Sequence, residues 1–225
     1  MFIVTGASRG LGQAIAERLI SSGAEVLGLA RNAEGLDFPA QACDVSQADS
    51  VKAIARKIRS EGRELHGVIN AAGIASMNLT LMSPPNQVEK VVHVNLLGTI
   101  FCSQAFAPLM IRRRQGRIIN FSTIAVPLAL PGEAIYSASK AGVEAFSRSF
   151  AREVSDFGIT VNCIAPGPID TDLLRGVSDE QIERIVNQQI IRRQATPEDV
   201  CDIVELLLDN KANSISGQVI NVGGV

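Results

Sequence analysis

TGASRGLG, residues 5–12, follows the apolar run FIV and leads into the amphipathic segment QAIAERLISSG. Its glycines are spaced G-x-x-x-G-x-G, and glycine lets the backbone approach a bound group more closely than residues with a Cβ. A strand, a glycine-rich turn and a helix in this order can hold a pyrophosphate at the helix N-terminus. The same turn can also be no more than a tight connection, so it predicts a dinucleotide site only within the appropriate fold.

The rest of the chain alternates short apolar runs with amphipathic segments. Further strands are expected at AEVLGLA, GVINAAG, GRIINFS, ITVNCIAPG and GQVINVGG, with another just before CDVS. Most are apolar on both faces, as parallel strands covered by helices are. The alternation predicts an α/β fold, a Rossmann-type doubly wound parallel sheet of about seven strands with helices on both faces. No Pro- or Ser-rich linker divides the chain, so one domain over residues 1–225 is expected.

Composition excludes several functional classes. The 225 residues include 21 basic and 23 acidic side chains, a balance that does not indicate a nucleic-acid or membrane-surface protein. No run of about 18 apolar residues predicts a membrane span, and no signal peptide is expected. The four cysteines and two histidines are scattered, so no metal site is expected and the cysteines are interpreted as reduced core residues of a cytoplasmic protein.

The end of the second expected strand bears on which dinucleotide would bind. An NAD site usually places an acid there for the ribose 2′-OH, but this chain continues with Arg31 and Asn32. Arg9 lies within the glycine turn itself, and two arginines suit a 2′-phosphate. NADP(H) is therefore the expected cofactor. Two alternatives remain: Arg31 is a solvated strand-end charge, or Glu34 or Asp37 folds back to bind the ribose.

AIYSASKAG, residues 134–142, contains the only tyrosine of the chain, Tyr136, four residues before Lys140. If the segment is helical, the two side chains lie one turn apart on one face. A nearby ammonium favours the phenolate and lowers the pKa of the phenol, which then exchanges a proton with an alcohol or carbonyl oxygen. Taken alone, the pair could equally be a packed tyrosine beside a surface lysine.

The order of motifs along the chain is more specific than any one of them. TGASRGLG, NAAG, Asn95, the pair Ser122 and Thr123, YSASK and APGPIDTDL follow one another in the sequence. This set resembles the short-chain dehydrogenase/reductase family over essentially the whole chain, and most resembles its bacterial 3-oxoacyl-(acyl-carrier-protein) reductases. The resemblance implies an NADPH-dependent carbonyl reductase of fatty acid biosynthesis acting on 3-oxoacyl thioesters. The alternative within the family is another ketone or alcohol, such as a sugar, a polyketide or a specialised metabolite.

The resemblance also implies the site residues. The catalytic set would be Asn95, Thr123, Tyr136 and Lys140, with Tyr136 as general acid, Lys140 lowering its pKa and Asn95 holding a water of a proton relay. The cofactor would be bound by residues of the glycine turn, the strand ends and the loop that closes over the nicotinamide: Gly6, Ser8, Arg9, Gly10, Leu11, Gly12, Arg31, Asn32, Asp44, Val45, Asn70, Ala71, Gly73, Tyr136, Lys140, Pro166, Gly167, Ile169 and Thr171.

One position departs from the family pattern. The family usually has a serine thirteen residues before the tyrosine, and this chain has Thr123 there. Threonine still offers a hydroxyl to a carbonyl oxygen, with a stiffer χ1. Ser122 could replace it only if the strand end shifted by one residue, which would turn its side chain to the other face. A third possibility is that neither hydroxyl acts and the enzyme is slow.

The expected substrate lid covers residues 170–196, with Ser178 as the N-cap of a helix inside it. The family resemblance implies that Arg114 and Arg175 contact an acidic acyl carrier protein if both lie at the pocket mouth; the alternative is a solvated helix end. It also implies a homodimer or homotetramer. A different class, a regulator that binds NADP(H) without turnover, is disfavoured by the complete Asn95, Tyr136 and Lys140 set, and a structural scaffold is less favoured still.

Overall fold

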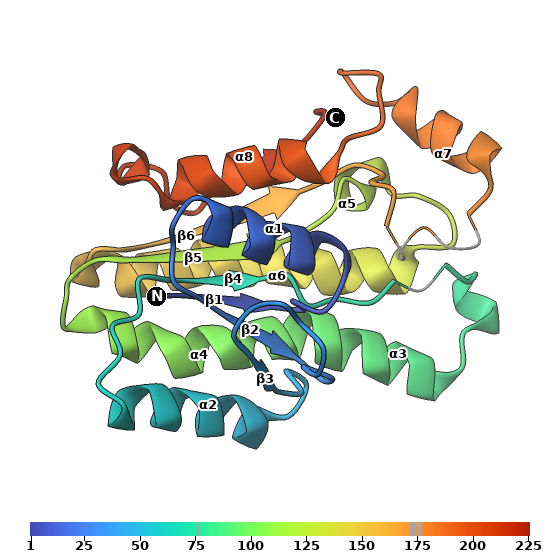
Figure 1. The fold of residues 1–225 in the computed structure, drawn as a ribbon. Coiled ribbons are helices and arrows are strands. Elements are labelled where there is room, and N and C mark those ends of the chain that lie inside the picture. The colour runs from blue at the N-terminus through green and yellow to red at the C-terminus, as the bar shows by residue number, and fades with distance from the viewer. Residues whose placement is uncertain (76, 172–173, 175–176) are drawn as a thin grey trace.

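A computed structural model describes residues 1–75, 77–171, 174 and 177–225. Seven strands form one parallel sheet in the order β3-β2-β1-β4-β5-β6-β7 (Figure 1). The strands are β1 (Phe2–Thr5), β2 (Val26–Ala30), β3 (Ala40–Ala42), β4 (Gly67–Asn70), β5 (Gly116–Phe121), β6 (Ile159–Ala165) and β7 (Val219–Asn221). The order reverses between β1 and β4, which is where a doubly wound sheet opens a crevice at its carboxyl edge.

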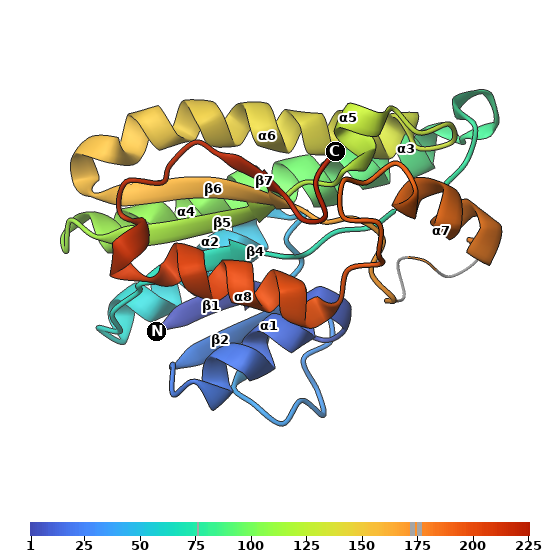
Figure 2. The same cartoon turned by 90° about the horizontal axis from the view of Figure 1, so that it is seen from above.

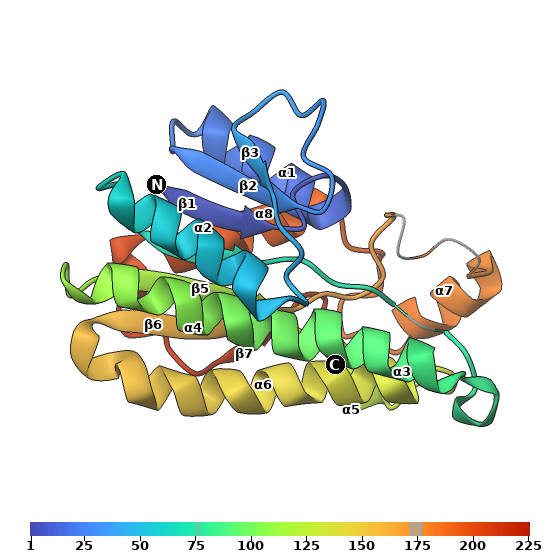
Figure 3. The same ribbon diagram turned by 90° about the horizontal axis from the view of Figure 1, so that it is seen from below.

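Helices cover both faces of the sheet. The two long helices on one face are α1 (Gly10–Ser21) and α8 (Pro197–Leu208), seen in front of the sheet in Figure 2. The other face, seen in Figure 3, carries α2 (Ala48–Ser60), α3 (Pro85–Val92), α4 (Gly98–Ile111) and α6 (Ala134–Val154). The short α5 (Ala125–Leu128) and α7 (Asp179–Val186) lie near the carboxyl ends of the strands. The predicted α/β architecture is confirmed.

The core consists of two layers, one on each side of the sheet. Alternate residues of a strand enter opposite layers: Ile3 packs with α2 and α4, whereas Val4 packs with α1 and α8. Both are fully buried, which explains why the strands are apolar on both faces. The core on both faces therefore fixes the positions of the segments that follow the strands at the carboxyl edge of the sheet.

Helix starts follow local sequence signals. Ser178 caps α7 and Thr196 caps α8, each by a reciprocal capping box with the residue three positions later. The predicted Ser178 cap is confirmed. Helix α6 begins at Ala134, so the segment of Tyr136 and Lys140 is helical and Tyr136 lies inside the first turn.

The helical stretch that begins at Pro85 is interrupted. Between α3 and α4 the backbone forms a π-helical turn, His93–Leu97. By length and composition alone, one stretch of the described residues, Pro85–Ile111, could cross a membrane. We interpret it as a core helix, because it lies along the sheet and α4 buries seven residues against it (Figure 3).

Candidate active site

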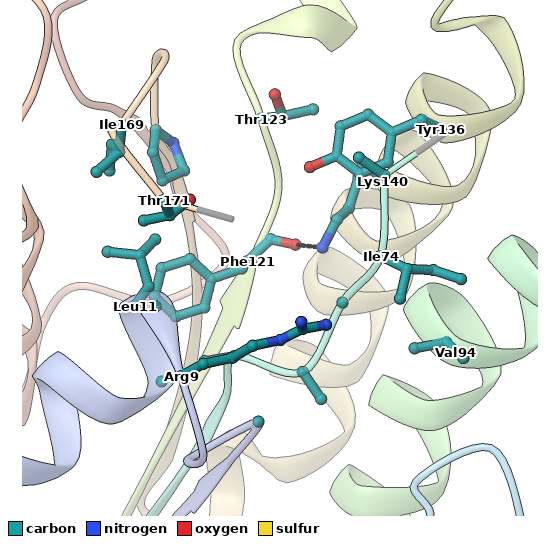
Figure 4. A pocket seen from close by; sticks show the side chains of 18 of the residues that line it. Arg9, Leu11, Ile74, Val94, Phe121, Thr123, Tyr136, Lys140, Ile169 and Thr171 are labelled. Carbon is teal, nitrogen blue, oxygen red and sulfur yellow. Dashed lines mark hydrogen bonds between the residues drawn. The ribbon is translucent and has the colours of Figure 1, made fainter. Parts of the chain in front are cut away.

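A cavity of about 320 Å³ opens at the carboxyl ends of the strands. Side chains reach it from the glycine turn, from the end of β5 and from α6 (Figure 4). Most of the predicted site residues line it: Gly6, Ser8, Arg9, Gly10, Leu11, Gly12, Arg31, Asp44, Val45, Ala71, Gly73, Thr123, Tyr136, Lys140, Pro166, Gly167, Ile169 and Thr171. Residues predicted from scattered motifs therefore converge on one place.

The glycine turn owes its shape to missing side chains. A Cβ on Gly12 would lie 2.3 Å from the Gly6 carbonyl oxygen, and one on Gly6 would lie 2.8 Å from the Cα of Ala72. Gly6 and Gly10 also have positive φ angles of 70° and 55°. Helix α1 then begins without a side-chain cap and without an acid in its first turn. Its N-terminal N–H groups and dipole are thus available to a phosphate, so the residues present fit a dinucleotide.

The cavity is basic where the glycine turn meets the end of β2. Arg9 and Arg31 both line the cavity, and Arg9 extends along its floor in Figure 4. Among the described residues that line the cavity, neither Glu34 nor Asp37 appears, which removes support for an acidic ribose site. Asn32 is exposed and is not among the residues that line the cavity, and its Oδ1 accepts a hydrogen bond from the backbone N–H of Glu34.

Tyr136 and Lys140 point from α6 into the cavity, facing Thr123 on the segment after β5 (Figure 4). The Lys140 Nζ lies 5.9 Å from the Tyr136 ring centroid and donates a hydrogen bond to the Phe121 carbonyl oxygen at 2.8 Å. Lys140 is only 4% exposed. A buried ammonium beside a phenol and a hydroxyl is an arrangement that can stabilise negative charge on an oxygen.

The two side chains resist charging in this ligand-free state. Burial lowers the pKa of Lys140 to about 8. Burial, with a smaller contribution from the Glu133 carboxylate, raises the pKa of Tyr136 well above its ordinary value, and a hydrogen bond with Thr123 opposes the rise. The predicted lowering of the Tyr136 pKa is therefore wrong for this state, because desolvation of the phenolate outweighs the distant ammonium. The phenol keeps its proton, as a proton donor must.

Asn95 sits in the π-helical turn and is fully buried. Its Oδ1 accepts from the Ile74 N–H at 2.8 Å, and its Nδ2 donates to the Ile74 carbonyl at 2.9 Å and to Ser139 Oγ at 3.1 Å. Thr99 Oγ1 donates to the Asn95 carbonyl. The side chain thus clamps the loop after β4 and does not itself line the cavity among the described residues.

Two hydroxyl side chains, Ser122 and Thr123, follow β5, and the alternation of side chains along the chain decides which one faces Tyr136. Ser122 is buried, and its Oγ donates to the Glu144 Oε1 at 2.6 Å. Thr123, the next residue, faces the other way, into the cavity beside Tyr136 (Figure 4). Both residues border the cavity, but successive side chains of an extended segment alternate in direction, so the Thr123 hydroxyl meets Tyr136 while the Ser122 hydroxyl is bound to Glu144.

Three predicted residues lie elsewhere. Asn70 is 3% exposed and its Nδ2 donates to Asn120 Oδ1 at 2.8 Å, so it supports the sheet instead of lining the cavity. Arg114 lies in the turn before β5, at the amino edge of the sheet, and donates to the Asp156 carbonyl. It is thus at the opposite edge from the cavity, so the condition that both arginines lie at the pocket mouth is not met for Arg114. Arg175 lies outside the described residues.

Sequence reasoning missed several cavity residues, of which Glu133 and Ile74 bear most on the chemistry. Glu133 is half-buried, lines the cavity three residues before Tyr136, and burial raises the pKa of its carboxyl. Its position in the first turn before the YSASK motif was a signal that could have been used. Ile74 lines the cavity through a loop whose position depends on Asn95, and nothing in the local sequence indicates that contact.

The fold and the cavity together define an α/β enzyme with a dinucleotide-type glycine turn and a tyrosine–lysine pair. Comparisons with known proteins agree. Residues 6–224 match the family model described as Enoyl-(Acyl carrier protein) reductase. The chain is 37% identical to the 3-oxoacyl-(acyl-carrier-protein) reductase FabG of Staphylococcus aureus strain Mu50 over 235 residues, covering 99% of this chain and 96% of that one. It is 36% identical to the Escherichia coli K12 protein of the same name, covering 99% and 95%.

Solved structures give the same answer. A putative gluconate dehydrogenase from Agrobacterium tumefaciens superposes with a TM-score of 0.93 at 26% identity, covering 100% of this chain and 94% of that one. Ligand-free aldohexose dehydrogenase from Thermoplasma acidophilum superposes with a TM-score of 0.90 at 30% identity, covering 99% and 92%. The chain belongs to the short-chain dehydrogenase/reductase family and is an oxidoreductase acting on CH–OH/C=O groups.

Proposed function

We propose that this enzyme reduces a 3-oxoacyl thioester with NADPH, the thioester being carried by acyl carrier protein in fatty acid biosynthesis. The observation that carries the proposal is the convergence of Thr123, Tyr136 and Lys140 on a cavity that begins at the uncapped N-terminus of α1. The names of the relatives with 36–37% identity support the thioester, and the basic corner at Arg9 and Arg31 supports NADPH. Residues 170–196 would form a substrate lid, and the enzyme would be a cytoplasmic homodimer or homotetramer.

The chain's residues would divide the reaction as follows. A nicotinamide cofactor, when bound, would supply the hydride for the carbonyl carbon. Thr123 holds the carbonyl oxygen through its hydroxyl, and Tyr136 donates its proton to that oxygen as charge develops. Lys140 stabilises the resulting phenolate, and its hydrogen bond with Phe121 fixes the ammonium in place. Asn95 positions the Ile74 backbone. The Asn95 carbonyl would hold a water that returns a proton to the phenolate through Lys140.

The first test is NADPH oxidation with acetoacetyl thioesters of carrier protein and of coenzyme A. Tyr136→Phe should abolish turnover while NADPH still binds, because only the proton donor is removed. Thr123→Ala should reduce turnover about 100-fold, the size expected for one oxyanion donor. Ser122→Ala is the matched control, because that hydroxyl is turned to Glu144. Turnover that survives in both the Tyr136 and Thr123 variants would refute the assignment.

The pH dependence tests Lys140 separately. Its pKa of about 8 means that the ammonium is present below this pH and is lost above it. We therefore expect the reduction rate to be level below about pH 8 and to fall as pH rises past it. A rate that stays level to pH 10 would contradict the role given to Lys140; the profile is measured at saturating NADPH so that binding does not contribute.

A second candidate substrate is supported by Glu133. Its half-buried carboxyl lines the cavity, and no hydrogen bond to it is found within the described residues. A carboxyl in that place would suit a substrate with hydroxyl groups next to the reacting carbon, and both structural relatives are dehydrogenases named for a sugar or a sugar acid. A panel of sugars and sugar acids run beside β-keto and enoyl thioesters separates these cases. Glu133→Gln should impair only the hydroxylated substrates.

A further inference from the structure

The segment after α7 lies between the cavity wall and the last residues of the chain. We call residues 189–195 the strap. Ala195 forms a parallel bridge with Ile169 of the cavity wall. The Ile191 N–H donates to the Gly223 carbonyl oxygen at 2.8 Å. The strap is therefore tied on one side to the loop that lines the cavity and on the other to the end of the chain.

Gln189, the first residue of the strap, is buried in an unusual way. It is 2% exposed, and its Nε2 donates to the Arg193 carbonyl oxygen at 3.3 Å. Its Oε1 is buried and accepts no hydrogen bond from any described residue. An unsatisfied buried carbonyl costs stability, so its position calls for a physical reason.

Two glycines explain where this oxygen lies. A Cβ on Gly167 would be 2.2 Å from Gln189 Oε1, and a Cβ on Gly223 would be 2.4 Å from it. The amide oxygen thus fills the space that side chains would occupy at both positions, and it faces the Cα–H groups of two segments far apart in sequence. The two glycines differ in backbone: Gly223 has a φ of +90°, whereas Gly167 is outside the positive-φ region.

Gly167 connects this contact to the reacting groups. It lines the cavity with Pro166, and the Pro166 carbonyl oxygen accepts a hydrogen bond from the Ile124 N–H at 3.1 Å, one residue after Thr123. A displacement of Gly167 toward or away from the strap therefore moves the wall of the cavity and the segment that carries the Thr123 hydroxyl.

We infer that Gln189 is a positioning residue, whose amide is wedged between Gly167 and Gly223 and sets the distance of the Pro166–Gly167 wall from Tyr136 and Thr123. The inference rests on the proposed cofactor site, because Gly167 is part of the wall expected to contact the nicotinamide. Gln189 itself touches no reacting group; it acts through the glycine.

A double-mutant cycle tests the wedge. Gly167→Ala alone should collide with the Gln189 amide, weakening NADPH binding and lowering the melting temperature, since the nearest atom outside Gln189, in Ile124, is at an ordinary 3.5 Å. Gln189→Ala alone should leave a gap and weaken NADPH binding about tenfold, with KM for NADPH rising more than kcat falls. In Gln189→Ala/Gly167→Ala the new methyl group takes the vacated space, so binding should return to within about threefold of wild type.

Two controls keep the test specific. Gln189→Ala/Gly223→Ala should show no such recovery, because alanine at a φ of +90° is strained whatever space is free. Gln189→Met, similar in volume, should keep NADPH affinity near wild type because it refills the gap. Additive effects of the Gly167 and Gln189 substitutions, or a Gln189→Ala protein with lower melting temperature and unchanged NADPH affinity, would overturn the inference.

Failure of the proposed function gives a different pattern. If the wild-type protein binds no NADPH, the proposed cofactor is wrong, and the cycle is then read from melting temperatures of the ligand-free variants alone. Recovery of the melting temperature in the double variant would still support the wedge, and additive losses would refute it.

Discussion

Helices α1 and α7 both border the cavity, through Leu11 and Ile185, but they are held in opposite ways. α1 starts without a side-chain cap and buries four residues against the sheet and α8. α7 starts with a complete capping box at Ser178, has Asp179 and Glu180 in its first turn, and buries none of its eight residues.

The contrast explains which end of the cavity can bind an anion. The N-terminal N–H groups of α1 have no side-chain cap, so they can bind a phosphate, and tertiary packing supplies the stability that the missing cap does not. The N-terminus of α7 is satisfied by its own side chains and carries negative charge, so it does not attract one. The α1 end of the cavity is fixed by the core, and the α7 end by local interactions.

The largest expected effect is at the packed end. Gly12→Ala places a methyl group 2.3 Å from a backbone oxygen that cannot move without displacing β1. We expect a loss of about 3 kcal/mol in the free energy of unfolding and no measurable NADPH binding. Urea unfolding and cofactor fluorescence measure the two.

Gly10→Ala is the matched control for that clash. Its Cβ would meet only ordinary contacts near 3.7 Å, so the cost is that of a positive φ of 55°, about 1 kcal/mol. Equal losses in the two variants would show that the turn depends on backbone strain alone and not on close approach.

Lys140, on α6, is expected to lower the stability of the protein while it supports activity. Its pKa falls from 10.5 to about 8 on folding, so the protonated amine disfavours the folded state by about 3 kcal/mol at 1.36 kcal/mol per unit. This penalty is complete below about pH 8 and fades as pH rises toward 10.5, where both states are neutral. The hydrogen bond with Phe121 returns about 1 kcal/mol.

Lys140→Met should therefore be more stable than wild type by about 2 kcal/mol at neutral pH, with turnover abolished. Denaturant unfolding at several pH values checks the sign. The advantage should shrink steadily above pH 8, and a variant that is less stable than wild type at pH 7 would contradict the burial argument.

The basic corner beside α1 should show a smaller, ligand-specific effect. Arg31→Ala removes a cation from the expected 2′-phosphate position, and we expect KM for NADPH to rise about 20-fold while KM for NADH stays unchanged. Arg56→Ala, which removes an exposed cation from α2, is the control for net charge. Equal changes for both cofactors would mean that Arg31 does not contact the phosphate.

The smallest effect should appear at α7. Ser178→Ala removes a cap worth about 1 kcal/mol to the helix, yet global stability should change by less than about 0.5 kcal/mol because no residue of α7 is fully buried. Thr196→Ala removes an equivalent cap from α8, which has four buried residues, and should show the full cost globally. Amide exchange at Gln181 should speed up in the Ser178 variant. Equal global losses would erase the distinction between the two ends.

Sequence reasoning succeeded where a feature depends on neighbours in the chain. Four features are local in this sense: the strand pattern, the glycine turn, the Ser178 cap and the helical spacing of Tyr136 and Lys140. The structure contains all four, in the predicted fold and around one cavity. The direction of Thr123 followed from strand alternation, which is also local.

What sequence reasoning missed depends on distant segments. The pKa of Tyr136 rises because of burial that only the folded cavity creates. Arg114 lies at the opposite edge from the cavity, because α4 runs the length of the sheet before β5 begins. Gln189 gains its place from Gly167 and Gly223, which no local pattern connects to it.

The π-helical turn at His93–Leu97 bears on how this site could have arisen and how it can be altered. Such a turn is one residue longer than an α-helical turn, so the side chains of α3 are rotated about the helix axis relative to those of α4. Point substitutions do not readily create or remove it, whereas a single-codon insertion or deletion does. Deleting one residue here should straighten Pro85–Ile111 and withdraw Asn95 from Ile74, so this stretch should tolerate many amino-acid exchanges but no change in length.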